Sequence, residues 1–263
     1  CGQIQARKKL VIHYHGTRFS GDVATTIRAL QGKHAFVSFA DKGDMEIIAE
    51  VCQSFALDNG AFSAWKSGKP LDVEGYAGWV EAFLRHPGMD FYCIPDDIEG
   101  GFESNRKMIA LWQNIVPHNM LIHGAPVWHL DEPLEALRDY CNAFQRVAFG
   151  SSAQYSVVGS PTWWSRMAEA MEYACDEHGR PKAKLHGLRM LDPTVFSHLP
   201  FSSADSTNVA RNIGMDSAWK GPYAPKSRET RALILMERIE AHCSASRWCN
   251  SSAGVQQNFE LFG

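Results

Sequence analysis

The stretch Ala56-Leu57-Asp58-Asn59-Gly60-Ala61-Phe62 places an acidic residue directly after a short apolar run and before small turn residues. Two further apolar runs end in the same way, at Asp96-Asp97 and at Asp205. Carboxylates at the ends of strands are typical of a (β/α)8 barrel, which builds its active site at the mouth formed by the carboxyl ends of its strands. The sequence therefore predicts an enzyme built on such a barrel.

The length and composition fit this architecture. The chain has 263 residues, close to the roughly 250 of one barrel, so we expect a single domain over residues 1–263. A net charge of −3 disfavours a protein that coats nucleic acid by bulk charge, and any nucleic-acid contact must be local. The seven cysteines lack the dense spacing of a secreted scaffold, and no run is long enough to span a bilayer. We expect a cytoplasmic protein, in the host cytoplasm if the chain comes from a phage, without a membrane partner.

Short apolar runs alternate with helical stretches along the chain. The runs are rich in aromatic and β-branched residues, as buried parallel strands are. This alternation predicts βα units around a parallel sheet. The expected strands are 9–15, 34–40, 54–58, 90–95, 120–124, 146–150, 184–191 and 201–205, and the clearest helices are 23–30, 76–85, 134–144, 165–175 and 229–241.

From the third expected strand onward, the order of motifs resembles the tRNA-guanine transglycosylase superfamily. These barrel enzymes exchange guanine in a polynucleotide for a 7-deazaguanine. Leu57–Phe62 resembles the family's Asp-Ser-Gly-Gly-Phe motif, and Pro95–Ile98 resembles its base-reading segment. Ala204–Ser206 sits where the family's nucleophilic Asp ends the eighth strand. The remaining matches are Ile122–Gly124, Ala148–Ser151 and Leu185–Leu188, so that the resemblance covers roughly residues 54–212.

The C-terminal region departs from the transfer-RNA enzymes of this family, which carry a Cys-x-Cys-x-x-Cys and His zinc site. Only His242, Cys243 and Cys249 are available here, and their spacing does not suit a closed four-ligand site. We expect no zinc-binding subdomain, no metal and no cofactor. The short chain resembles instead the branch found in bacteriophages and bacterial DNA-modification islands, which places 7-deazaguanine derivatives such as 7-cyano-7-deazaguanine in DNA. The resemblance implies DNA and a free 7-deazaguanine base as partners.

Base exchange at a glycosidic carbon sets its own chemical requirements. It calls for a carboxylate on the sugar face opposite the leaving base and a second group that manages protons. We assign Asp205 as the nucleophile that attacks C1′ and holds the sugar covalently, and Asp58 as the acid/base. The alternative for an Asp at a strand end is a helix N-cap.

A guanine-like base also needs an acceptor for its N1–H and N2–H₂ groups. Asp96 or Asp97 suits this task, and adjacent strand residues point to opposite faces, so we expect one of the two in the pocket. Asp97 aligns better with the family. The alternative for either is a helix cap or a surface ion pair.

The remaining base contacts are expected from three segments of the chain. His123 and the backbone N–H groups of Gly124 and Gly150 are candidates to donate to the base O6. His186 and Gly187 lie in the segment that resembles the family's seventh strand. For both histidines the alternative is an interior side chain whose hydrogen bonds are satisfied within the fold.

Basic residues near the mouth predict a strip that contacts phosphates. The segment after the eighth strand emerges on the active-site face, where cationic side chains can grip a nucleic-acid backbone. The alternative is a solvated loop. The candidates are Arg18, Lys220, Lys226, Arg228 and Arg231.

Other functions stay open alongside exchange in DNA. They are a transfer-RNA enzyme, which the missing zinc motif disfavours, a non-catalytic nucleic-acid-binding barrel, and a hydrolase that leaves an abasic site. The sequence does not decide which 7-deazaguanine is used, the target sequence or the oligomeric state.

Overall fold

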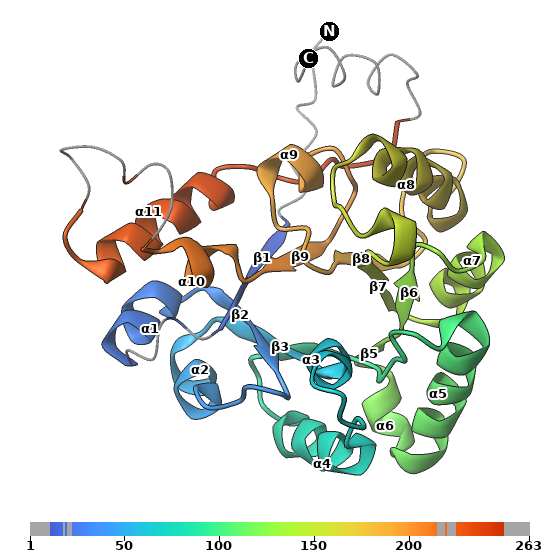
Figure 1. The fold of residues 1–263 in the computed structure, drawn as a ribbon, viewed down its shortest axis with the longest axis horizontal. Coiled ribbons are helices and arrows are strands. Elements are labelled where there is room, and N and C mark those ends of the chain that lie inside the picture. Colours follow the sequence, from blue (N-terminus) through green and yellow to red (C-terminus); the bar gives the residue numbers. More distant parts are fainter. Residues whose placement is uncertain (1–10, 18, 20–22, 215–218, 220–224, 250–263) are drawn as a thin grey trace, which may run out of the picture.

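A computed structural model describes residues 11–17, 19, 23–214, 219 and 225–249. The strands of this part pair in parallel in the order β5-β4-β3-β2-β1-β9-β8-β7-β6. Figure 1 shows the ring that these strands form. The strands are β1 (Ile12–Gly16), β2 (His34–Ser38), β3 (Ser54–Asp58), β4 (Met89–Cys93), β5 (Gly124–Ala125), β6 (Val127–His129), β7 (Arg146–Gly150), β8 (Lys184–Gly187) and β9 (Ser203–Ser206).

Pro126 divides the fifth strand position in two. β5 pairs with β4 and β6 pairs with β7, and only Pro126 separates the two short strands. Proline has no N–H and interrupts the ladder, but its carbonyl accepts from the Ala148 N–H at 2.9 Å. The ring therefore has eight strand positions, and the predicted α/β barrel fold is confirmed.

The fifth strand does not lie where the sequence predicts it. Met120 and Leu121 belong to the short helix α6 (His118–Leu121), which begins directly after Pro117, and the strand starts only at Gly124. Met120 is buried, which explains an apolar residue at this position. A short apolar run fits a helix as well as a strand. The prediction of a strand over 120–124 is wrong.

Helices surround the ring of strands (Figure 1). All five predicted helical stretches overlap helices of the structure, with ends that agree or differ by up to four residues. Among the described residues the other elements are α1 (Val23–Leu30), α2 (Met45–Val51), α3 (Ala61–Lys66), α4 (Val73–Phe83), α5 (Gly101–Ile115), α7 (Leu134–Ala143), η1 (Ala153–Tyr155), α8 (Pro161–Ala174), α9 (Pro193–Phe196), α10 (Asn208–Asn212) and α11 (Arg228–Glu240). No helix in this part of the chain is both long and apolar enough to cross a membrane.

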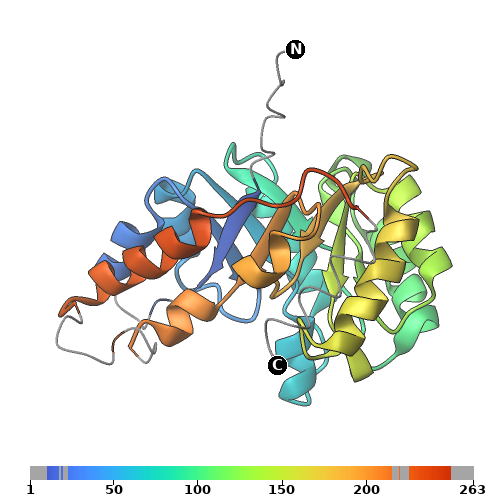
Figure 2. The ribbon, with the colours of Figure 1, turned by 90° about the horizontal axis from the view of Figure 1, so that it is seen from above.

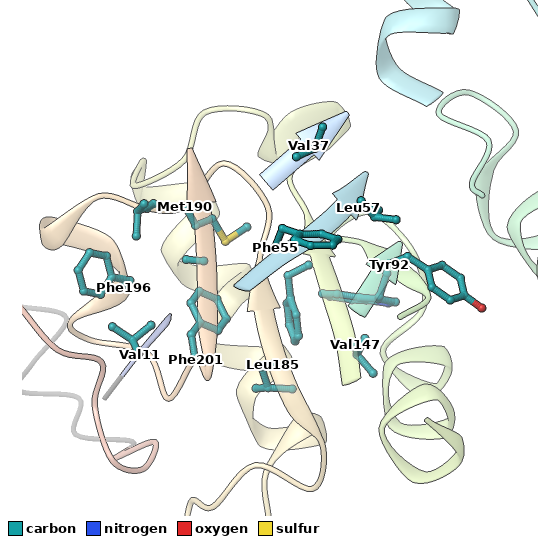
Figure 3. Close-up of a cluster of buried hydrophobic side chains, with 14 of the residues drawn as sticks. Val11, Val37, Phe55, Leu57, Tyr92, Val147, Leu185, Met190, Phe196 and Phe201 are labelled. Carbon is teal, nitrogen blue, oxygen red and sulfur yellow. The ribbon is translucent and has the colours of Figure 1, made fainter. Parts of the chain in front are cut away.

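Alternation along each strand separates two apolar clusters. Phe55 and Leu57 of β3 belong to the larger cluster, together with Val147 of β7, and Figure 3 shows part of it. Ala56 of the same strand points into the ring, where it packs with Tyr14 and other inward side chains. Successive strand residues face opposite sides of a sheet, so Asp58, two residues after Ala56, points into the ring at its mouth.

Candidate active site at the barrel mouth

The structure brings three carboxylates together at the mouth. Asp58 is the last residue of β3, Asp205 lies in β9, and Asp96 follows the end of β4. The charges of Asp205 and Asp96 both act on Asp58, and all three act on the buried Cys93 thiol beneath them. Like charges close to a carboxylate disfavour its ionised form. The mouth therefore has the means to hold and release a proton.

Asp58 is the carboxylate whose protonation is most affected. Burial, followed by the charges of Asp205 and Asp96, raises its pKa to about 6, against opposing contacts with the Ser38 hydroxyl and the Gly60 amide. The Gly60 N–H donates to Asp58 Oδ2 at 3.3 Å. Gly60 has a φ of +76°, which starts the turn into α3 without the penalty a side chain would bring. A carboxyl group with a pKa near 6 can both donate and accept a proton near neutral pH.

Asp205 is held through one oxygen. The backbone N–H of Arg189 donates to Asp205 Oδ1 at 3.0 Å, and His186 Nε2 lies 3.3 Å from the same oxygen. Within the described residues, no hydrogen bond is formed to Oδ2. One carboxylate oxygen is thus anchored and the other is left for a ligand.

Asp96 is the member of the adjacent pair that enters the mouth. Its Oδ1 accepts from Asn59 Nδ2 at 2.7 Å, and its Oδ2 lies 2.9 Å from His129 Nε2. Asn59 also donates to the Ile94 carbonyl at 2.8 Å, which fixes its amide. Each carboxylate oxygen has a second lone pair, so Asp96 can accept further hydrogen bonds from a ligand.

Asp97, the favoured candidate of the pair, turns away from the mouth. Its carboxylate accepts the N–H groups of Glu99 at 3.2 Å and Gly100 at 3.0 Å and the Ser104 hydroxyl at 2.6 Å. The Ser104 bond, followed by these backbone bonds, lowers the pKa of Asp97. These bonds hold the turn that precedes α5, whose first residue is Gly101. The preference for Asp97 over Asp96 is corrected.

His129 is a site residue that the sequence analysis missed. It ends β6 and lies against Asp96 and beside Gly150, where an added Cβ would come within 3.1 Å of its Nδ1. Burial lowers the pKa of His129, but the hydrogen bond to Asp96 and the charges of Asp96, Glu132 and Asp131 together outweigh this and raise it overall. The shifted strand boundary hid His129, because a fifth strand ending at residue 124 leaves it in a loop.

His123 and Gly124 lie away from the mouth. His123 Nδ1 is 3.4 Å from the carbonyl of Asp90, the second residue of β4. His123 also lines a cavity of about 170 Å³ with Arg146 and Lys184, which begin their strands. A Cβ atom at Gly124 would meet Tyr92 and Ile94 on the outer face of the barrel. Because the true strand begins at Gly124, both residues lie near the amino end of the ring. Their assignment to the base site is corrected.

The other candidates from the seventh and eighth expected strands divide between interior and mouth. His186 is fully buried inside the ring below Asp205. Gly187 faces outward, where an added Cβ would meet Phe201 at 2.7 Å, so its small size serves packing. Its assignment to the base site is corrected. Gly150 ends β7 at the mouth beside His129.

The rim of the mouth combines aromatic and cationic side chains. α3 follows Asp58 directly and carries Phe62 and Trp65, whose side chains are exposed and whose ring centroids are 5.4 Å apart. The Arg189 guanidinium lies over the Phe62 ring at 3.9 Å from its centroid. Figure 2 shows the short helix α3 projecting beyond the ring of strands. Surfaces of this composition suit nucleic acid, since rings stack on bases and guanidinium groups pair with phosphates.

The proposed phosphate strip is described in part. Arg18 and Lys220 lie outside the described residues. α11 begins at the mouth side, because its last residue, Glu240, pairs with Lys33 just before β2. Arg228, the first residue of α11, and Lys226, two residues before it, therefore lie near the mouth, and both side chains are exposed.

Arg231 has a structural partner. Its Nε donates to the Pro225 carbonyl at 2.6 Å, and its guanidinium lies 6.0 Å from the Trp219 ring centroid. Part of its hydrogen-bonding capacity is used to hold the segment before α11.

The histidine and cysteines near the C-terminus do not gather into a site. His242 bonds through Nδ1 to the Arg238 carbonyl at 3.0 Å, Cys243 is half-buried and Cys249 is exposed. In the part of the chain that the structure describes, no group of three or more His, Cys, Asp or Glu side chains is arranged to hold a metal ion.

The fold and the mouth define an α/β barrel with a carboxylate-lined site. No family model and no curated protein matches the chain. A solved structure from Aquifex aeolicus VF5 is similar, with a TM-score of 0.51 and 11% identity over 90% of this chain and 92% of that one. Two mutant tryptophan synthase alpha-subunits from the hyperthermophile Pyrococcus furiosus have TM-scores of 0.49 and 0.47, with 12% and 11% identity. They cover 86% and 89% of this chain and 98% and 97% of their own. At this identity the likeness shows the fold alone.

Proposed function

We propose that the protein is a transglycosylase that exchanges guanine in DNA for a 7-deazaguanine base. The observation that carries the proposal is the pair formed by Asp58 and Asp205. Asp58 has a pKa raised to about 6, and among the described residues Asp205 is anchored only through Oδ1. Two carboxyl groups with different tasks are what double displacement at a glycosidic carbon requires.

In the first step, Asp205 Oδ2 attacks C1′ of the target deoxyribose. The C1′–Oδ2 bond forms, the C1′–N9 bond to guanine breaks, and its electron pair goes to the leaving base. Protonated Asp58 supplies the proton that makes guanine a neutral leaving group. The sugar is then held as an ester of Asp205.

In the second step, the incoming 7-deazaguanine replaces guanine on the same face. Ionised Asp58 removes the proton from N9 of the new base, N9 attacks C1′, and the Asp205 carboxylate leaves. Asp58 ends protonated and Asp205 ends ionised, so the cycle closes without a cofactor. A proton carrier with a pKa near the working pH suits both steps.

Asp96 supports recognition of a guanine-like base in this scheme. Its oxygens, already oriented by Asn59 and His129, have free lone pairs for the N1–H and N2–H₂ groups of the base. His129, whose Nε2 lies 2.9 Å from Asp96 Oδ2, holds the carboxylate in its orientation toward the base. The target base has to leave the helix stack or be unpaired to reach this depth.

The test is product analysis with matched variants. The protein is incubated with guanine-containing duplex DNA, single-stranded DNA and transfer RNA, each with 7-cyano-7-deazaguanine, and the digested nucleosides are analysed by mass spectrometry. We expect a modified deoxynucleoside with the wild type and none with Asp205→Asn. Asp139→Asn, which removes an exposed carboxylate on α7, controls for the change of charge and is expected to behave as the wild type.

The same experiment separates the alternatives. Without added base, the wild type is expected to form a covalent DNA adduct that a denaturing gel detects and Asp205→Asn does not form. Modified ribonucleoside alone would move the activity to transfer RNA, and abasic DNA without incorporation would mean a hydrolase. If no polynucleotide gives either a product or an adduct, the proposal is overturned.

A further inference from the structure

A line of buried polar groups runs through the barrel interior up to Asp205. It starts at Asp90, whose carboxylate accepts two bonds from Arg146 Nη2, at 2.8 Å to Oδ2 and 3.1 Å to Oδ1. Arg146 Nη1 donates to Ser203 Oγ at 2.9 Å. Ser203 Oγ lies 2.8 Å from His186 Nδ1, and His186 Nε2 lies 3.3 Å from Asp205 Oδ1. The line thus connects four strands of the ring with the candidate nucleophile.

The chemistry of these groups gives the line a direction. A guanidinium only donates, so Ser203 Oγ must be the acceptor from Arg146. Ser203 is fully buried, and in the described part of the chain its hydroxyl contacts only Arg146 and His186. The single hydroxyl hydrogen of Ser203 therefore has His186 Nδ1 as its acceptor. A proton on Nδ1 instead would leave that hydrogen unpaired in the interior, which is costly.

The other ring nitrogen confirms the same tautomer from the opposite side. With Nδ1 as an acceptor, the neutral ring carries its proton on Nε2, which faces Asp205 Oδ1. The reverse tautomer would turn an Nε2 lone pair toward a carboxylate. Burial lowers the pKa of His186, although the hydrogen bond and charge of Asp205 oppose this, so the ring is neutral at neutral pH. Nε2 lies 3.3 Å from Asp205 Oδ1, although without the alignment of a full hydrogen bond within the described residues.

We propose that His186 is a positioning residue for Asp205, with its tautomer set by Arg146 through Ser203. His186 Nε2–H and the Arg189 N–H together hold Oδ1, so that Oδ2 is the oxygen that attacks C1′. This inference rests on the proposed function, since it assigns the two oxygens of that nucleophile. It replaces the role of His186 in base binding expected from the sequence.

The two donors serve both chemical steps. When Oδ2 bonds to C1′, Oδ1 becomes the carbonyl oxygen of the ester and faces both N–H groups. When the new base displaces Asp205, negative charge returns to the carboxylate, and the same donors stabilise it as a leaving group. Fixed donors aimed at an oxygen where charge develops are among the stronger contributions to catalysis.

Substitutions at His186 test the role of the Nε2 donor. Gln can place an N–H near the position of Nε2, whereas Leu cannot. We expect His186→Leu to slow formation of the covalent DNA adduct by about 100-fold, with the KM for the incoming base unchanged. His186→Gln should recover most of that loss. His118→Leu, an exposed histidine on α6, is the matched control and should react as the wild type.

Comparing the rate of adduct formation with the KM for the incoming base separates a positioning role of His186 from a direct contact with the base. A rise in KM for 7-cyano-7-deazaguanine with little change in the adduct rate would show that His186 contacts the base, and would overturn the inference. Equal rates for the Gln and Leu variants, with thermal melts showing both folded, would also overturn it, because the donor would then have no role.

The tautomer can be measured without any activity. In ¹⁵N-labelled protein at neutral pH, we expect long-range ¹H–¹⁵N spectra to show His186 with a protonated Nε2 and an unprotonated Nδ1, assigned by the signals lost in His186→Gln. Ser203→Ala should mix the two tautomers. An Nδ1–H tautomer or an imidazolium in the wild type would overturn the inference. If no adduct forms with the wild type, the proposed function fails. The spectra still decide which nitrogen of His186 carries the proton in the line of buried polar groups.

Discussion

Arg189 donates its backbone N–H to Asp205 Oδ1 at 3.0 Å while its own φ is +59°. Its guanidinium lies 3.9 Å from the centroid of the Phe62 ring. One residue in a strained backbone conformation therefore touches both the candidate nucleophile and the helix that follows Asp58. A left-handed conformation at a residue with a Cβ persists only where the surrounding contacts impose it, and such residues cluster at functional sites.

Replacing Arg189 tests whether this strain is real. Arg189→Gly and Arg189→Ala both lose the contact with Phe62, but only Gly adopts a positive φ without a penalty. We expect the free energy of unfolding of Arg189→Gly to exceed that of Arg189→Ala by about 1 kcal/mol. Urea denaturation of the two variants measures the difference, and an Ala variant as stable as the Gly variant would contradict it.

The raised pKa of Asp58 predicts a pH-dependent stability. Its folded pKa of about 6 lies above the ordinary value of 3.8. The stability that protonated Asp58 contributes is therefore fully present below about pH 4 and is lost as the pH rises through 6. Asp58→Asn cannot ionise, and its stability relative to the wild type should therefore increase between pH 4 and pH 7. After a discount for partial solvent screening, we expect a change of about 1–2 kcal/mol.

Urea denaturation at both pH values measures this change, with Asp139→Asn as the control for loss of an exposed carboxylate. A constant difference between Asp58→Asn and the wild type from pH 4 to pH 7 would contradict the raised pKa. The same variant should lose base exchange, as is common where an active site holds a group in an unfavourable state.

The barrel and its carboxylates were predictable because their signals are local. Asp58 and Asp205 stand at strand ends beside small turn residues, and alternation from the buried strand core sends them into the mouth. The motif order could thus identify these two candidates before the fold was known. The positive φ of Arg189 has no such signal, since nothing about an arginine in sequence indicates a left-handed backbone.

The errors in the predicted base site have two causes: the fifth strand was misplaced, and the alternation of side chains does not extend beyond the end of β4. Met120 to His123 form an apolar run that packs as a helix and turn, and taking it for a strand brought His123 into the site and left His129 out. Asp96 and Asp97 lie beyond the end of β4, where strand alternation no longer holds. Which of them faces the mouth is decided by tertiary contacts, with Asn105 Oδ1 accepting from the Asp97 N–H at 2.6 Å.

The different roles of Asp96 and Asp97 can be separated by substitution. Asp97→Ala removes the acceptor for the Glu99 and Gly100 N–H groups and the Ser104 hydroxyl. We expect it to lower the free energy of unfolding by about 1 kcal/mol without changing the affinity for 7-cyano-7-deazaguanine. Asp96→Asn keeps the shape but loses the charge, and we expect it to weaken binding of the base at least tenfold, as for a lost hydrogen bond to a charged group. Isothermal titration calorimetry and urea denaturation measure the two quantities, and a larger loss of affinity in Asp97→Ala would restore the original assignment.

The exposed cations at the start of α11 predict how DNA affinity depends on salt. If Lys226 and Arg228 each neutralise one phosphate, a log–log plot of the binding constant against salt should lose about 0.9 units of slope for each substitution by Gln. Such contacts carry no sequence information, so binding should weaken by a similar factor on DNA of different sequences. Lys107→Gln, an exposed cation on α5, is the control and should keep the wild-type slope. Titrations by fluorescence anisotropy at several salt concentrations measure the slopes. Equal slopes for all three variants would mean that the start of α11 is a solvated segment, and the phosphates would then have to be held by the rim around Arg189 and α3.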